Sequence, residues 1–204
     1  MSNCRFRPLR LTALAALALS ACGTTTGGSP PTSETPMSAG RFASTLHICN
    51  GDHTDNAPPA DSGRHIINYQ PFANVAGATL ARAPVRRARF SSGFGFRHDR
   101  AGRHKGIDLS TGHSHAVYAA GNGVVEEMRA AGGYGNMILI RHNSRVQTRY
   151  GHLSSYASEM HLGHQVRLGD IIGRTGKTGN AEAVILHYEI IVDGEPRDPM
   201  RIGF

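Results

Sequence analysis

Two residues four positions apart, His104 and Asp108, carry the first candidate chemistry of this chain. An imidazole nitrogen and a carboxylate oxygen are both ordinary ligands of zinc in proteins. On a straight strand the two side chains would lie ~13 Å apart, too far to share an ion, and Gly106 and Ile107 argue against a helix. A turn at Lys105-Gly106 would bring them together. The stretch therefore fits either a metal site or a surface loop in which His104 is solvated and Asp108 caps the turn.

Two further histidines lie in strand-like contexts, His152 in "RYGHLSS" and His187 in "AVILHYEI". Alternate residues of a strand share a face, so we expect Ile185, His187 and Glu189 on one face and the intervening apolar residues on the other. His187 then lies either in a core or in a site on that face. His152, at the end of a strand, is by itself an ordinary half-exposed polar residue.

Short runs rich in Val, Ile and Tyr, separated by glycine, predict an all-β domain. They include "AVYAAGNGVVEEM", "GGYGNMILIRH" and "VQTRYGHL". Gly121-Asn122-Gly123 and Asp193-Gly194 have the residues that tight hairpin turns require. No segment keeps a 3.6-residue apolar period for long enough to predict a large helix. We therefore expect one compact antiparallel β-sheet domain, a sandwich or half-barrel, at residues 84–204.

The order and local context of these segments resemble the lysostaphin/LytM-type zinc metallopeptidases, a family of peptidoglycan endopeptidases. The resemblance runs from about Pro84 to Met200 and includes "FSSGFGFR", "HKGIDLS", "VYAAGNGVV", "GGYGN", "YGHLS", "GDIIGRTGKTG" and "LHYEIIVDGEPRDP". It implies a LytM-like fold and a zinc cofactor.

The resemblance also implies roles for individual residues. His104, Asp108 and His187 would hold the zinc ion, with one coordination position left for water, and His152 would be the catalytic histidine. The family closes its site with His-x-His, in which the first histidine is also catalytic. Ile185 stands at that position here. His113 and His115 form a similar pair, but they lie at the wrong point in the family order, and we interpret them as a surface loop.

Three functions remain open at this point. The first is a zinc endopeptidase that cuts peptide cross-links in peptidoglycan, with activity attenuated by Ile185. The second is a catalytically inactive LytM-domain lipoprotein that binds peptidoglycan and activates cell-wall amidases. The third is a passive peptidoglycan-binding lipoprotein. The complete ligand set favours the first function, and Ile185 favours the second.

The start of the chain predicts an exported lipoprotein. Three arginines precede a short apolar run at residues 11–19, which is typical of a signal peptide and too short to span a bilayer. Leu19-Ser20-Ala21-Cys22 resembles the lipobox of bacterial lipoproteins; the alternative is ordinary secretion with Cys22 as a bystander. We expect a signal peptide at residues 1–21 and a lipid anchor at Cys22. The expected location is the cell envelope, on the periplasmic face of the outer membrane.

The segment between the anchor and the domain has a different composition. Residues 22–62 are rich in Thr, Ser, Gly and Pro, which predicts a flexible linker. Residues 63–83 fit either a lead-in helix or a strand. Of the three cysteines, Cys4 belongs to the signal peptide and Cys22 to the lipid anchor, so we expect a domain without disulfides.

Charge indicates the class of partner. The formal net charge of +7 falls to +4 when the signal peptide is removed, because residues 1–21 contain three arginines and no acid. A basic exported protein is attracted to anionic polymers of the cell envelope. The chain has no tryptophan and no basic helix, so nucleic acid is not an expected partner.

Overall fold

The computed structural model describes residues 42–50, 54–97 and 102–203, and almost all of its regular structure is β-strand. One 3₁₀ turn, η1 (Gly132–Tyr134), accompanies the strands. The strands are β1 (His47–Ile48), β2 (Phe72–Val75), β3 (Ala78–Ala81), β4 (Arg89–Ser92), β5 (Gly95–Phe96), β6 (Arg103–His104), β7 (Ile107–Ser110), β8 (Ala116–Tyr118), β9 (Gly123–Ala130), β10 (Asn136–Arg141), β11 (Val146–Tyr156), β12 (Gln165–Val166), β13 (Ile171–Thr175), β14 (Ile185–Val192) and β15 (Glu195–Arg197).

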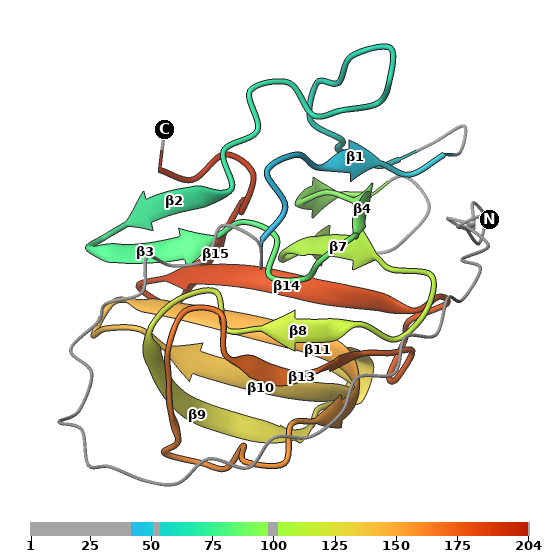
Figure 1. The fold of residues 1–204 in the computed structure, drawn as a ribbon. Helices are drawn as coiled ribbons and strands as arrows, with labels where there is room; N and C mark the ends of the chain where they lie inside the picture. The colour runs from blue at the N-terminus through green and yellow to red at the C-terminus, as the bar shows by residue number, and fades with distance from the viewer. Residues whose placement is uncertain (1–41, 51–53, 98–101, 204) are drawn as a thin grey trace, which may run out of the picture.

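One large sheet dominates the molecule, with the strand order β1-β4-β7-β14-β11-β10-β9-β12. In Figure 1 it runs from β1 at the top through the long β14 to β9 at the bottom, and its lower part is strongly curved. Strand β13 lies outside this linear order and pairs with both β11 and β8. Every pairing is antiparallel except that of β1 with β4. The predicted all-β, antiparallel fold is confirmed.

Strand β14 has the two-faced pattern that the sequence predicts. Leu186, Tyr188 and Ile190 belong to the main hydrophobic core and are fully buried. Burial of such side chains contributes ~1.5–3 kcal/mol each, which fixes the register because a slip of one residue would reverse the faces. The other face carries His187 and Glu189, which are joined by a hydrogen bond.

One of the two expected hairpin turns forms. Asp193-Gly194 connects β14 to β15 with positive φ at both residues, +53° and +80°, as a tight hairpin requires. The hairpin expected at Gly121-Asn122-Gly123 is wrong, because β8 pairs with β13 and β9 pairs with β10 and β12. After β8 the chain runs against β3 instead, where the amide of Ala81 donates to the carbonyl of Ala120 at 2.7 Å.

Part of the segment expected to be a linker is packed on the domain. Phe42, Leu46 and Ile48 are buried in the main core, and β1 extends the large sheet. The expectation of a flexible linker is therefore wrong for residues 42–50, because these apolar side chains find partners across the sheet. The ambiguous residues 63–83 contain the β2–β3 hairpin.

Several sequence expectations concern residues outside those described. The signal peptide at residues 1–21 and the lipid anchor at Cys22 are among them. The expectation of a domain without disulfides is wrong, since Cys49 is disulfide-bonded.

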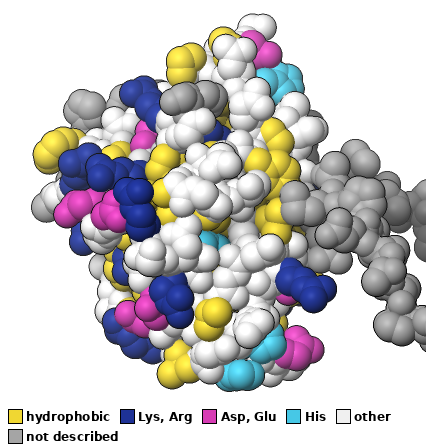
Figure 2. All heavy atoms as spheres, turned by 90° about the vertical axis from the view of Figure 1, so that its left-hand side faces the viewer, with side chains coloured by type: hydrophobic (Ala, Val, Ile, Leu, Met, Phe, Trp, Pro, Cys, Tyr) yellow, Lys and Arg dark blue, Asp and Glu magenta, His cyan; other side chains and the backbone are white. Residues whose placement is uncertain are grey.

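Within residues 42–50, 54–97 and 102–203, no helix is long and apolar enough to cross a membrane. Basic and acidic side chains lie next to one another on the face shown in Figure 2.

Candidate metal centre

A tight turn brings His104 and Asp108 together, as the metal-site reading requires. His104 ends β6 and Asp108 lies in β7, with Lys105-Gly106 between the strands. Glycine is required at 106, since a Cβ there would lie 2.2 Å from the carbonyl oxygen of Tyr188. The backbone of β14 therefore passes directly over the turn.

Sheet register adds His187 to this pair. Strand β14 is antiparallel to β7, and His187 lies opposite Asp108 in the ladder. Strand β4 pairs with the other edge of β7, where Ser92 lies opposite Asp108. The three candidate ligands are thus held by adjacent strands of one sheet, which fixes their separations.

The three donor atoms converge at distances that suit one small cation. His104 Nε2 lies 3.0 Å from His187 Nδ1, and Asp108 Oδ1 lies 2.9 Å from His187 Nδ1 and 3.2 Å from His104 Nε2. Ligands of a tetrahedral zinc ion with bonds of ~2.0–2.1 Å are roughly 3.3 Å apart. Small outward movements would therefore admit the ion, and the three residues form a group that could hold a metal.

Hydrogen bonds on the far side of each imidazole determine which nitrogen is available. His104 Nδ1 lies 2.6 Å from the carbonyl oxygen of Gly93, and His187 Nε2 lies 3.0 Å from Glu189 Oε1. Both partners are acceptors, so these two nitrogens carry the protons. His104 Nε2 and His187 Nδ1 are then the nitrogens that face the Asp108 carboxylate, and they can present lone pairs to a metal once the protons shared with that carboxylate are released. The three atoms therefore form a ligand set for one cation.

A buried network surrounds His187 and stabilises positive charge on it. Glu189 is fully buried, accepts a second hydrogen bond from the Tyr134 hydroxyl at 2.7 Å, and forms an ion pair with Arg149 at 2.5 Å. Burial lowers the pKa of His187, but the hydrogen bonds with Asp108 and Glu189 outweigh it and raise the pKa to about 9. The pocket is therefore electrostatically suited to a cation.

Asp108 is held in its charged form. Arg97 Nη2 donates to Asp108 Oδ2 at 2.7 Å, so the second oxygen remains directed toward the two histidines. Burial raises the pKa of Asp108, yet the hydrogen bonds from His104 and His187 hold it well below its usual range. A charged carboxylate is the form that binds metal.

His152 lies next to this group, near the middle of β11. Its ring centroid is 5.9 Å from that of His187, and its Nδ1 donates to the carbonyl of Thr178 at 2.8 Å. Burial lowers its pKa, so the ring is neutral at pH 7 with a lone pair on Nε2. Its φ of +61° lies in the left-handed region, a strained conformation for a residue other than glycine that is common at functional sites.

Ile185 begins β14, two residues before His187 on the same strand face. It is 9% exposed, and its amide donates to the carbonyl of Gly176, a residue whose backbone also packs on that of His152. An alkyl side chain therefore stands at the start of β14, two residues before the candidate ligand His187.

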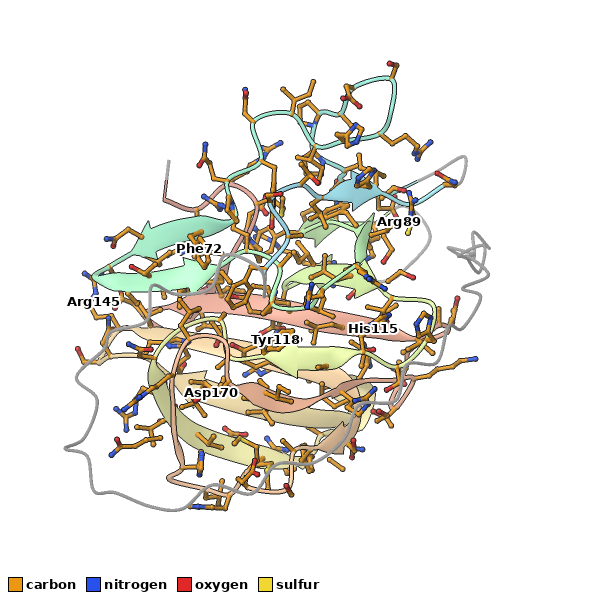
Figure 3. The ribbon with its side chains drawn as sticks, viewed as in Figure 1. Phe72, Arg89, His115, Tyr118, Arg145 and Asp170 are labelled. Carbon is orange, nitrogen blue, oxygen red and sulfur yellow. The ribbon has the colours of Figure 1, made fainter. Side chains whose placement is uncertain are left out.

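The remaining candidate histidines have other partners. His113 and His115 lie in the loop before β8 with ring centroids 4.3 Å apart, as the surface-loop interpretation expects; Figure 3 labels His115 at the right-hand end of β8. His142 bonds to the carbonyl of Asn122 and the hydroxyl of Thr148.

Sequence reasoning placed Glu189 on the face of His187 but gave it no role, and it missed Tyr134, Arg149 and Arg97. A carboxylate two residues after a candidate ligand on one strand face was the available signal for Glu189. The other three pairings join distant parts of the chain, and no local pattern announces them.

Comparisons with known proteins relate this domain to a family of peptidases. Residues 102–199 match the model of peptidase family M23. An uncharacterized metalloprotease of Haemophilus influenzae is 35% identical over 77% of this chain and 34% of its own length. The DD-carboxypeptidase/endopeptidase Mpg of Neisseria meningitidis is 36% identical over 59% and 28%. A lipoprotein NlpD/LppB homolog of Pseudomonas aeruginosa is 37% identical over 48% and 32%. The chain thus spans about a third of the length of these relatives.

Solved structures show the same fold. A zinc-containing peptidase from Vibrio cholerae superposes with a TM-score of 0.55 and 31% identity, over 69% of this chain and 42% of that one. The catalytic domain of lysostaphin from Staphylococcus simulans gives 0.51 and 29%, over 55% and 90%. Residues 102–199 thus match peptidase family M23 and form a domain of lysostaphin-like fold.

Proposed function

We propose that this chain is a cell-envelope zinc metallopeptidase of the peptidoglycan endopeptidase type, which hydrolyses peptide bonds in cell-wall cross-links. The observation that carries the proposal is the convergence of His104 Nε2, His187 Nδ1 and Asp108 Oδ1, three atoms able to ligate a metal, beside the neutral His152. The match of residues 102–199 to a peptidase family supports this chemical interpretation. The chain spans only about a third of the length of its curated relatives. Their activities therefore support the proposal and do not establish it.

In this proposal the three atoms hold zinc, and each is oriented from behind. Gly93 fixes the tautomer of His104, Glu189 fixes that of His187, and Arg97 holds the second oxygen of Asp108. Zinc bound there would polarise the scissile carbonyl and lower the pKa of a coordinated water to ~7. Such outer hydrogen bonds keep ligands in place and raise their basicity.

His152 takes the role of general base. Its Nδ1 proton is committed to the carbonyl of Thr178, which leaves Nε2 to accept a proton from the attacking water. The lowered pKa keeps this nitrogen unprotonated at neutral pH. The strained backbone at His152 holds the ring at this position next to His187.

Ile185 sets the expected rate. Its side chain can neither transfer a proton nor form a hydrogen bond, at the position where the family that this chain resembles has a second catalytic histidine. Loss of one acid–base group typically lowers the rate by ~10²–10⁴-fold. We therefore propose a slow enzyme that depends on His152 alone for proton transfer.

The experiment uses the full chain, saturated with zinc and incubated with purified peptidoglycan, and follows released muropeptides by mass spectrometry. The native chain is expected to release them slowly, His152→Ala to release none above a protein-free blank, and Ile185→His to release them at least tenfold faster. If the native chain gives no more product than His152→Ala, the enzymatic proposal fails.

The second candidate function is a catalytically inactive lipoprotein that binds peptidoglycan and activates a cell-wall amidase. The specific observation that favours it is Ile185, two residues before His187 on the same face of β14, and the similarity to an NlpD/LppB lipoprotein homolog is consistent with it. Anchoring through lipid at Cys22, on the periplasmic face of the outer membrane, belongs to both proposals. Stimulation of a purified amidase on peptidoglycan by both the native chain and His152→Ala would support this function.

A further inference from the structure

Among the described residues, the groove beside the candidate metal centre is lined by three basic side chains of Arg and Lys and by one carboxylate. It has a volume of about 250 Å³, and its lining includes Arg97, Arg103, Lys105 and Glu189. Glu189 is already paired with Arg149, and Asp108 with Arg97. Arg103 and Lys105 are exposed and have no ion pair with another described residue.

Surplus positive charge is not confined to the groove, since the exposed Arg86, Arg87 and Arg167 also form no ion pair with a described residue. Other surface arginines are matched with acids, as in Arg145 with Asp193 at 2.6 Å and Arg129 with Glu127 at 3.0 Å. Figure 3 labels Arg145 at the left of the molecule, and Figure 2, which faces that side, shows basic side chains beside acidic ones. Surplus positive charge in a groove concentrates the field and attracts anionic ligands.

The position of the surplus charges relates them to the proposed chemistry. Arg103 and Lys105 flank the candidate ligand His104 in the chain, so both side chains begin within one residue of it. A peptide spans ~3.3–3.6 Å per residue, so a group bound by either cation lies within a few residues of the scissile bond.

The neighbouring aromatic rings complete an extended surface. The guanidinium of Arg103 stacks over Phe94 with its carbon 4.8 Å from the ring centroid. Phe96, opposite Arg103 in the β5–β6 pair, is 76% exposed. On the other side of the groove the Tyr134 hydroxyl is committed to Glu189, so the polar contacts that the groove offers a ligand are predominantly cationic.

We infer that this groove selects peptides that carry a free carboxylate close to the scissile bond, and that Arg103 and Lys105 bind that carboxylate. The inference rests on the proposed function for the identity of the peptide as substrate. Arginine binds carboxylates through its planar array of donors and lysine through a compact charge, so the pair tolerates several positions of the acidic group. Peptides in which that group is an amide bind more weakly.

The test measures binding without cleavage. Stem tetrapeptides from peptidoglycan, with their carboxylates free or converted to amides, are titrated calorimetrically into the zinc-loaded full chain. The native chain is expected to bind the free form at least tenfold more tightly. Arg103→Gln/Lys105→Gln should reduce that preference to less than threefold, and Lys105→Gln alone should give an intermediate value. Arg167→Gln/Arg201→Gln removes the same charge at two exposed residues outside the groove lining and should retain the native preference.

Three outcomes would overturn the inference. The first is equal binding of both peptide forms by the native chain. The second is full retention of the preference in Arg103→Gln/Lys105→Gln, which would assign the carboxylate to the metal. The third is loss of the preference in the control variant Arg167→Gln/Arg201→Gln. Cleavage by the native chain without a carboxylate preference would leave the proposed function intact and remove only this inference. A carboxylate preference without cleavage would remove the proposed peptidase activity and leave the carboxylate binding by Arg103 and Lys105 intact. Thermal unfolding of each variant checks that it is folded.

Discussion

Replacement of Glu189 by glutamine tests whether the network behind His187 holds the metal ligand. Glu189 is fully buried and accepts from His187, Tyr134 and Arg149. Glutamine keeps the shape but removes the charge, and one of its two terminal atoms becomes a donor. It can therefore satisfy at most part of this set of three donors, and His187 loses the anion that fixes its tautomer.

Two magnitudes follow from these contacts. Loss of an outer-shell partner of a metal ligand lowers metal affinity by ~10–100-fold, which is ~1.4–2.7 kcal/mol. Loss of a hydrogen bond to a charged group costs ~1.5–3 kcal/mol of stability. Because the Arg149 side chain is 21% exposed and can reach water, we expect Glu189→Gln to lower the free energy of unfolding by about 2 kcal/mol.

Competition with a chromophoric chelator measures the zinc affinity, and urea unfolding of the zinc-free chain measures the stability. The exposed Glu195→Gln on β15 is the matched control and should change neither quantity. A zinc affinity of Glu189→Gln within twofold of native, in a folded variant, would refute the positioning role of Glu189.

Three further predictions concern the frame of the site, its pH dependence and its metal. Gly106→Ala should lower the free energy of unfolding by about 2–3 kcal/mol, since its Cβ would lie 2.2 Å from the Tyr188 carbonyl; Gly133→Ala, which meets only a side chain at 3.2 Å, should cost less than ~1 kcal/mol in the same urea titration. Burial lowers the pKa of His142 below 6.5, so the unfolded chain binds the extra proton and stability should fall as pH drops below 6.5; His142→Asn should flatten the pH dependence in thermal denaturation, and an unchanged slope would contradict this assignment. Zinc at 100 times its dissociation constant should stabilise the fold by ~2.7 kcal/mol, and EDTA should reverse the shift in melting temperature; a melting temperature insensitive to both would contradict metal binding to the folded state.

The parts of the site that the sequence predicts well are those set by local pattern. The alternation around His187 defines the faces of β14, and the turn at Lys105-Gly106 places His104 next to Asp108. Both features depend on residues within a few positions of one another. Resemblance to a known family supplied the rest of the ligand assignment, since spacing alone left a surface loop equally open.

The parts that could not be predicted depend on contacts between distant segments. Leu46 and Ile48 lie in a polar, Thr- and Ser-rich stretch, and their burial requires β4, about forty residues later, as a partner. The turn residues at Gly121–Gly123 predict a hairpin, but β8 pairs with β13 instead. The ion pair of Arg149 with Glu189 likewise depends on the register of β11 against β14.

The zinc content of each chain directly tests the candidate metal centre of His104, Asp108 and His187. The metal-free full chain is titrated with zinc, dialysed, and analysed by atomic emission, beside His104→Ala and the double variant His113→Ala/His115→Ala. We expect one tightly held zinc per native chain, the same in the double variant, and none after dialysis in His104→Ala. A native chain that retains no zinc, or His104→Ala that retains as much as native, would contradict the assignment of His104, Asp108 and His187 as a metal centre.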